Sequence, residues 1–276
     1  MNIKKIAIGL STLTLTFGLV ANTPVSAEPS VKTKLVANEK IETKDELIQT
    51  IKEINKSSEI KNLSTGEKVK VADEILKNAT KEAKKEYDKQ MMDEVKKGSE
   101  KIDMEKVNET GFDSAEITLS DGSKVEYQVS DISESEEYSL QGQSMSPFVN
   151  TTKKYGDRRF TATITFDSWG VTVGKISLGT HYTIGDYGLK MRYVSKGGTE
   201  SYSGLFDIQD ANVKVTDSRA EKVGYDINGF GSYKVHAGLG WLSGTKYFEL
   251  TSTIKLYSLN KSNRSAYVQQ SYRFVD

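Results

Sequence analysis

The chain has 276 residues, of which 28% are charged, and its formal net charge at pH 7 is zero. It contains no cysteine, which excludes disulfide bonds, a lipid-bearing cysteine and a cysteine nucleophile. The charge is uneven: residues 28–147 have 27 acidic and 19 basic side chains (net −8), whereas residues 148–276 have 11 and 17 (net +6). Such a modest positive charge, without a basic stripe, disfavours nucleic acid as a partner.

The N-terminal residues have the three regions of a secretory signal peptide. Lys4 and Lys5 give a positive start, residues 6–20 form an apolar stretch, and Val25-Ser26-Ala27 offers small residues for cleavage. The apolar stretch is shorter than the ~20 residues needed to cross a bilayer. Residues 1–27 are therefore predicted to be a signal peptide that is cleaved after Ala27. The mature protein is expected to be secreted and extracellular, and the lysine-rich start is typical of Gram-positive bacteria.

A leader and a helical segment are predicted to follow. Residues 28–42 are polar and lack periodicity, which favours a flexible leader, and residues 43–129 are predicted to form a helical segment with a β-hairpin. Thr43 and Glu46 have the spacing of a capping box at the start of a short helix. The same spacing at Ser64 precedes a longer helix, which is predicted from one apolar stripe and a glycine expected to cap its end: Val71, Ala72, Ile75, Leu76, Ala79, Ala83, Tyr87, Met91, Val95 and Gly98.

From residue 115 the apolar residues alternate with polar ones, and this pattern indicates β-strands. Asp121-Gly122 is typical of a two-residue turn, so a hairpin is predicted around it. Because an isolated hairpin is barely stable in water, it is expected to pack on the helices or to join the later sheet. Residues 130–147, which are rich in Ser, Glu and Gln, are predicted to be a linker.

Residues 148–276 are predicted to form an all-β domain. They contain 20 of the 25 aromatic residues, and about eight short strands with regular turns favour an antiparallel β-sandwich or a small barrel. The fold class is therefore α+β overall, with an all-β C-terminal domain after an α-helical segment and a β-hairpin. Turns are predicted at Ser168-Trp169-Gly170, Gly197-Gly198 and Asn228-Gly229, and one of the strands at Tyr202–Phe206.

No motif for catalysis or metal binding is present. His181 and His236 are the only histidines and are isolated from other chemistry-bearing residues in sequence, which favours structural roles. The Gly-x-Ser-x-Gly pattern of serine hydrolases is absent. The sequence thus assigns no catalytic residue, no metal site and no cofactor. It leans toward a non-enzymatic protein but leaves the question open.

Aromatic and basic side chains of the C-terminal domain are the candidate binding residues. Exposed aromatic rings stack on sugar rings, and cations attract anionic polymers or lipid headgroups. The alternative is that the same aromatic residues fill the core of the β-domain. The candidate set is Trp169, Tyr187, Tyr202, Trp241, Arg158 and Arg159.

Two segments of the C-terminal domain, Tyr155–Ala162 and Asp217–Gly229, resemble uncharacterised small secreted β-domain proteins of Gram-positive, spore-forming bacteria. This resemblance covers only residues 150–275. It implies an extracellular all-β domain and adds no catalytic residues.

The leading hypothesis is a secreted, non-enzymatic binding protein whose β-domain contacts cell-wall polymer, a membrane surface or another protein. The helical segment would then be an interaction arm or a removable pro-region. One alternative is a membrane-acting antimicrobial or toxin-like protein, because the alternating residues from Phe160 to Leu178 could form an amphipathic hairpin. The other alternative is an extracellular hydrolase that uses carboxylates.

Overall fold

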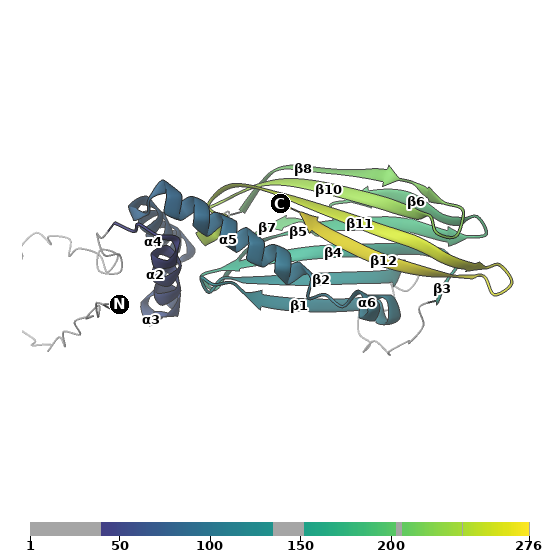
Figure 1. The fold of residues 1–276 in the computed structure, drawn as a ribbon, viewed down its shortest axis with the longest axis horizontal. Helices are drawn as coiled ribbons and strands as arrows, with labels where there is room; N and C mark the ends of the chain where they lie inside the picture. Colours follow the sequence, from purple (N-terminus) through teal and green to yellow (C-terminus); the bar gives the residue numbers. More distant parts are fainter. Residues whose placement is uncertain (1–39, 135–151, 203–205, 239, 276) are drawn as a thin grey trace, which may run out of the picture.

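Helices precede the strands along the described part of the chain (Figure 1). The computed structural model describes residues 40–134, 152–202, 206–238 and 240–275. The signal peptide, residues 28–39 of the leader and residues 135–147 of the linker lie outside the described residues. The helices are α2 (Lys44–Lys56), α3 (Ser58–Lys61), α4 (Thr65–Asn78), α5 (Lys81–Ser99) and α6 (Met104–Thr110), with a 3-10 turn η2 (Gly240–Leu242). The strands are β1 (Phe112–Thr118), β2 (Lys124–Ser133), β3 (Thr152–Lys154), β4 (Gly156–Ser168), β5 (Val171–Gly185), β6 (Gly188–Ser195), β7 (Glu200–Ser201), β8 (Phe206–Asp217), β9 (Arg219–Ala220), β10 (Asp226–Ala237), β11 (Gly244–Asn260) and β12 (Ser265–Val275).

The predicted combination of N-terminal helices and antiparallel strands is confirmed. Seven strands form one sheet in the order β1-β2-β4-β5-β6-β9, with β7 paired to β5, and five form a second sheet in the order β3-β12-β11-β10-β8. The apolar sides of the two sheets meet, and the ring of Phe166 on β4 stacks on that of Phe248 on β11 with centroids 5.2 Å apart. Among the described strands, neither sheet closes on itself.

Both capping boxes are present. The Thr43 hydroxyl accepts from the backbone N–H of Glu46 at 3.2 Å, and the Glu46 carboxylate accepts from the N–H of Thr43. Ser64 and Glu67 form the same arrangement at the start of α4. These predictions succeeded because a capping box depends only on residues within one helical turn.

The long helix expected after Ser64 is divided into α4 and α5. Thr80 starts the second helix, since its hydroxyl accepts from the N–H of Ala83 at 3.2 Å. Ala79 leaves the helix and forms an isolated bridge with Ile41, whose N–H donates to Asn78. Residues 40–42 of the expected flexible leader are therefore ordered, and the apolar side chain of Ile41 is buried.

Gly98 is not a cap but an interior residue of α5, which ends after Ser99. A Cβ atom at this position would lie 2.3 Å from Cδ1 of Ile117 and 2.9 Å from the hydroxyl of Tyr127. The glycine therefore allows α5 to approach the β1–β2 hairpin closely.

The β1–β2 hairpin joins the C-terminal strands in one sheet. β2 pairs with β4 along its whole length, from Lys124↔Asp167 to Ser133↔Arg158. Residues 130–133 of the expected linker belong to β2, and the expected boundary at residue 148 does not separate the two sheets. The connection between β1 and β2 spans residues 119–123 rather than two residues, because the Asp121 side chain is buried and bonds to Tyr87 and Ser123.

Two of the three predicted turns are confirmed. Trp169 and Gly170, both with positive φ, connect β4 to β5, and Gly197-Gly198 lies between β6 and β7. The prediction at Asn228-Gly229 is wrong, since both residues lie inside β10. A Cβ at Gly229 would come within 3.0 Å of atoms from Ser252, Thr180 and Val194. That glycine is therefore explained by close packing between the sheets and not by a turn.

Helices α5 and α6 close the side of the core that lies between β1 and β12, the edge regions of the two sheets (Figure 1). The Tyr127 hydroxyl donates to the carbonyl of Val95 at 2.5 Å, and that of Tyr272 donates to the carbonyl of Ser99. No helix in the described ranges combines the length and the apolar character that crossing a membrane requires.

Asp113 ties the start of α6 to β1. Its carboxylate accepts from the Lys106 ammonium at 2.6 Å and from the Asp103 N–H at 2.9 Å. Burial acts to raise the pKa of Asp113, but these hydrogen bonds outweigh it and leave the pKa below its ordinary value.

Candidate functional site

The outer face of the seven-stranded sheet is lined with short polar side chains. Alternate residues of β4 are buried in the core, so the residues between them point to the opposite face. On that face Thr163 is paired with Gln128 of β2 and with Ser177 of β5, and Thr161 is paired with Ser130 of β2. The outward residues of β4 that form this pattern are Arg159, Thr161, Thr163 and Thr165.

These side chains line an open groove of about 580 Å³, here called the hydroxyl groove. Its lining contains two cations, one at each end, and no carboxylate. Arg159 and Thr165, the pairing partner of Lys175, are six residues apart on β4, which corresponds to about 20 Å along the strand. The groove is lined by Gln128, Ser130, Arg159, Thr161, Thr163, Thr165, Thr172, Lys175, Ser177, Gly179, Ser195, Gly197, Gly198 and Tyr202.

The turn between β6 and β7 forms one side of the hydroxyl groove. The Thr199 hydroxyl accepts from the Ser177 N–H at 2.9 Å and donates to the Ser177 carbonyl at 3.2 Å. It thus bonds to the two backbone groups of β5 that a neighbouring strand would otherwise pair with. The hydroxyls of Thr163 and Ser177 are 3.0 Å apart. The polar surface is thus held in place by its own hydrogen bonds.

At one end of the groove, Lys175 and Tyr202 lie together. The Lys175 ammonium is 5.8 Å from the centroid of the Tyr202 ring and 3.2 Å from the Glu200 carboxylate. The hydrogen bond with Tyr202, followed by that with Glu200, raises the pKa of Lys175, so the ammonium is charged at neutral pH. This end therefore offers an aromatic ring beside a fixed cation.

At the other end, His181 bonds to a carboxylate and to a serine. Its Nδ1 is 2.6 Å from Oε1 of Glu134, and its Nε2 is 3.2 Å from Oγ of Ser195. The ring of Tyr193 stacks on the imidazole with centroids 4.0 Å apart, and His181 is only 7% exposed. His181 is therefore isolated along the sequence but has close polar partners in the folded structure. His236, by contrast, is exposed, and its Nδ1 is 3.4 Å from the Thr245 hydroxyl.

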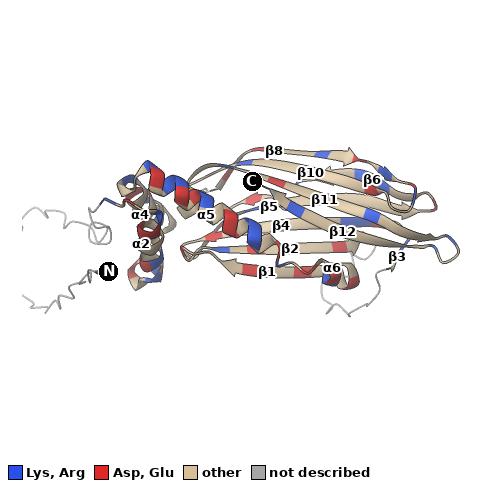
Figure 2. Cartoon of the chain, in the orientation of Figure 1, with Lys and Arg blue, Asp and Glu red and all other residues tan. Residues whose placement is uncertain are grey.

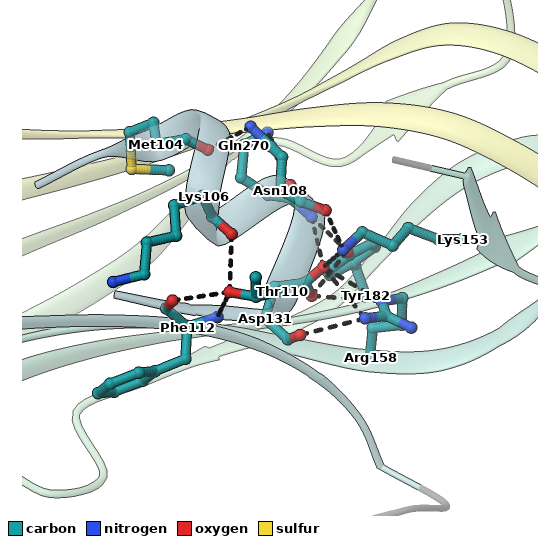
Figure 3. A network of polar contacts seen from close by, with 10 residues as sticks. All are labelled: Met104, Lys106, Asn108, Thr110, Phe112, Asp131, Lys153, Arg158, Tyr182 and Gln270. Atoms are coloured by element: carbon teal, nitrogen blue, oxygen red, sulfur yellow. Dashed lines mark hydrogen bonds and ion pairs between the residues drawn. The ribbon is translucent and has the colours of Figure 1, made fainter. Parts of the chain in front are cut away.

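Arg158 does not belong to this groove. It points into the core, where the Asp131 carboxylate accepts from its guanidinium, from the Tyr182 hydroxyl and from the Gln270 amide (Figure 3). The Asp131 side chain is fully buried, and the Lys153 ammonium lies 3.4 Å from it. Burial acts to lower the pKa of Arg158, but the charge of Asp131 outweighs it and raises the pKa. This network joins the two sheets and has a structural role.

The other predicted binding residues are also separated. Trp169 is 2% exposed and Trp241 is fully buried, so neither can stack on a ligand at the surface. Tyr187 is 45% exposed, but it lies in the turn between β5 and β6 and does not line the groove. Of the six candidates, only Arg159 and Tyr202 line the hydroxyl groove, and they lie at its opposite ends.

A second cavity, of about 750 Å³, lies where α2 meets the tips of the β1–β2 and β4–β5 hairpins. Lys52, Lys56 and Lys124 line it together with Asp167. Figure 2 shows that charged residues are dense on the helices, whereas the strands have fewer of them. Within the described ranges, no three His, Asp or Glu side chains are grouped closely enough to bind a metal ion.

The chain was also compared with known proteins. No protein-family model, no curated protein and no solved structure matches it.

Proposed function

We propose that the protein is exported, that its two sheets form a β-sandwich, and that the hydroxyl groove binds an extended, anionic, polyhydroxylated polymer of the cell envelope. The observation that supports this proposal most directly is the composition of the groove. It combines hydroxyl and amide groups along its floor with one cation at each end, Arg159 and Lys175, the latter paired with the neighbouring Glu200.

The floor of the groove suits a polyhydroxylated ligand. Hydroxyl groups both donate and accept hydrogen bonds, and the Gln128 side chain does the same through its amide. Side chains on adjacent strands lie about 5 Å apart, so successive strands present a regular two-dimensional array of such groups. An extended sugar or polyol chain has hydroxyls along its length that match an array of this kind.

The ends of the groove suit negative charge. Arg159 and Lys175 attract phosphate or carboxylate groups of the polymer, and the planar guanidinium forms paired hydrogen bonds with either group. The signal-like N-terminus would deliver the protein to the compartment in which such polymers occur.

A membrane-acting role has less support. The apolar residues of the Phe160–Leu178 hairpin are buried against the second sheet, so inserting them into a bilayer would require opening the core. A hydrolase with paired carboxylates is not favoured either. Burial raises the pKa of Asp121, but this residue is fully buried beneath Tyr87 and Ser123 and does not meet solvent.

The test is retention of the purified chain on isolated Gram-positive cell walls, measured before and after the anionic polymer has been removed chemically. Retention is expected on intact walls and is expected to disappear on stripped walls and at high salt. Arg159→Ala removes charge-assisted hydrogen bonds worth about 1.5–3 kcal/mol, so the Kd should rise roughly 10- to 100-fold. Thr161→Val keeps the side-chain shape and should weaken binding by a smaller factor.

Arg273→Ala is the matched control. Arg273 is exposed and lies on the outer face of the other sheet, so this variant loses the same charge without changing the groove. Equal binding by Arg159→Ala and the unmodified chain would refute the assignment of the groove. Equal retention on stripped walls, or retention only on vesicles of anionic lipid, would refute the choice of polymer.

A further inference from the structure

The Glu134–His181–Ser195 arrangement has the connectivity of a nucleophilic triad. A carboxylate bonds to Nδ1 of the imidazole at 2.6 Å, and the other ring nitrogen bonds to a serine hydroxyl at 3.2 Å. The carboxylate at Nδ1 favours the tautomer in which Nδ1 bears the proton, so Nε2 can accept the proton of the serine hydroxyl. Both distances are within the range expected for groups that exchange a proton.

The strand pairing creates this geometry. His181 lies on β5 opposite Tyr193 of β6, and Ser195 lies opposite Gly179, two residues along the same face. A Cβ at Gly179 would be 2.6 Å from Oγ of Ser195 and 3.6 Å from Nε2 of His181, so only glycine leaves room for the pair. Ser195 lines the hydroxyl groove, whereas His181 is covered by the Tyr193 ring.

The carboxylate is also fixed. Glu134 accepts from the Arg192 guanidinium, which forms a second ion pair with Asp157 at 3.2 Å. Burial acts to raise the pKa of Glu134, but the hydrogen bonds from His181 and Arg192 lower it overall, so the group remains an anion at neutral pH. A fixed anion at Nδ1 stabilises the imidazolium that forms when Nε2 takes a proton.

We propose that Ser195 is a nucleophile activated by His181, that Glu134 is a positioning residue, and that the site hydrolyses ester substituents on the polymer bound in the hydroxyl groove. The choice of substrate rests on the proposed function. The reactivity of Ser195 rests only on its contact with His181 and on the contact of His181 with Glu134.

The reaction balances with water as the only co-reactant. Oγ of Ser195 bonds to the ester carbonyl carbon while its proton moves to Nε2 of His181. The carbon–oxygen bond to the alcohol then breaks, and His181 returns the proton to the departing alcohol. Water attacks the acyl-serine in the same way, which releases the carboxylic acid and restores Ser195.

The turn that follows Ser195 is the source of hydrogen bonds to the intermediate. A Cβ at Gly197 would lie 3.7 Å from Oγ of Ser195, so the backbone of this turn passes beside the nucleophile. We assign the backbone amides of Gly197 and Gly198 as the donors to the oxyanion that forms at the ester carbonyl.

The first test is covalent labelling of the purified chain with a fluorophosphonate, followed by peptide mass spectrometry. A single adduct on Ser195 is expected, and it should be absent in Ser195→Ala and at least tenfold slower to form in His181→Gln. Ser271, which is exposed on the outer face of the other sheet, should remain unlabelled, and Ser271→Ala should label normally. No adduct, an adduct on another residue, or equal labelling of His181→Gln would overturn the proposal.

The second test is steady-state hydrolysis of a small activated ester. Ser195→Ala and His181→Gln should lower the rate by at least about 100-fold. Glu134→Gln keeps the shape of the side chain but removes its charge, so kcat should fall at least about tenfold while KM stays unchanged, because the anion stabilises an imidazolium that forms only during the reaction. An unchanged kcat, or a rise in KM alone, would contradict the role of Glu134.

Failure of this proposal can be distinguished from failure of the proposed function. Retention on walls without labelling of Ser195 would leave a binding groove with no chemistry. Labelling without retention would leave a reactive serine whose substrate is not the envelope polymer.

Discussion

Replacing Asp131 with alanine is expected to cost more stability than any other single change to a polar group described above. The carboxylate accepts hydrogen bonds from Arg158 at 3.2–3.3 Å, from Tyr182 at 3.0 Å and from Gln270 at 2.6 Å (Figure 3). Lys153 is its second cationic neighbour. Asp131→Ala removes the one anion and leaves both cations in place, with side chains only 12% and 7% exposed.

The expected loss follows from burial. Removing one partner of a buried ion pair typically costs about 3–5 kcal/mol, because the remaining charge is neither solvated nor compensated. The whole chain is expected to have about 5–15 kcal/mol of stability. For a protein of this size each kcal/mol corresponds to about 2–4 °C in Tm, so Tm should fall by roughly 6–20 °C.

The assay is urea-induced unfolding followed by circular dichroism, with Glu116→Ala as the control. Glu116 forms an ion pair with Lys124 at 2.7 Å, but both side chains are about half exposed, at 53% and 49%. An exposed pair of this kind contributes about 0–1 kcal/mol. Asp131→Asn, which retains an acceptor but no charge, should fall between the two variants.

A loss of less than about 1 kcal/mol in Asp131→Ala, equal to that of the exposed pair, would refute this reasoning. It would mean that water reaches the two cations and that the network does not join the sheets as described.

Three further predictions concern packing, pH and the tryptophans. Gly98→Leu should destabilise the protein by at least about 1–3 kcal/mol in urea unfolding, because the new side chain meets the β1–β2 hairpin. Gly66→Ala, in a helix with no atom within 4 Å of the new Cβ, should stabilise it by up to about 1 kcal/mol; the same sign for both would contradict the packing argument. Asp113→Asn should cost about 1–2 kcal/mol at pH 7. Because the pKa of Asp113 is lowered in the folded state, this difference should be complete above the unfolded pKa of about 4, shrink as the pH falls from there, and disappear only below the folded pKa. A constant difference across pH would be the opposing result. Both tryptophans should resist quenching by acrylamide, and the polymer should leave their emission unchanged because their rings are buried; strong quenching would show that a ring is exposed.

Local signals predicted local structure well. The capping boxes at Thr43 and Ser64 and the turn at Trp169-Gly170 depend on residues that are neighbours in sequence. The errors came from tertiary contacts. Gly98 resembles a helix cap and Gly229 resembles part of a turn, but each glycine is required by atoms of another strand or helix. Composition likewise gave no information on which aromatic residues fill the core.

Only part of the site could be predicted. Arg159 and Tyr202 were among the candidates and line the groove, but the polar face between them was not predicted. The partners on β2, β5 and β6 become visible only when the strand register is known. Glu134 is 47 residues from His181 and lies within the expected linker, so no motif could link the two.

The Asp131 network has a consequence for the order of folding. It unites groups that are far apart along the chain: Asp131 and Gln270 are 139 positions apart, and Asn108 and Gln270 are 162 positions apart. Contacts of such long range slow folding, because large loops must close before any contact is formed. The strand that completes the network, β12, is the last of the described strands in chain order. The earlier strands must therefore wait, with a charged side chain still hydrated, until β12 is available to pair.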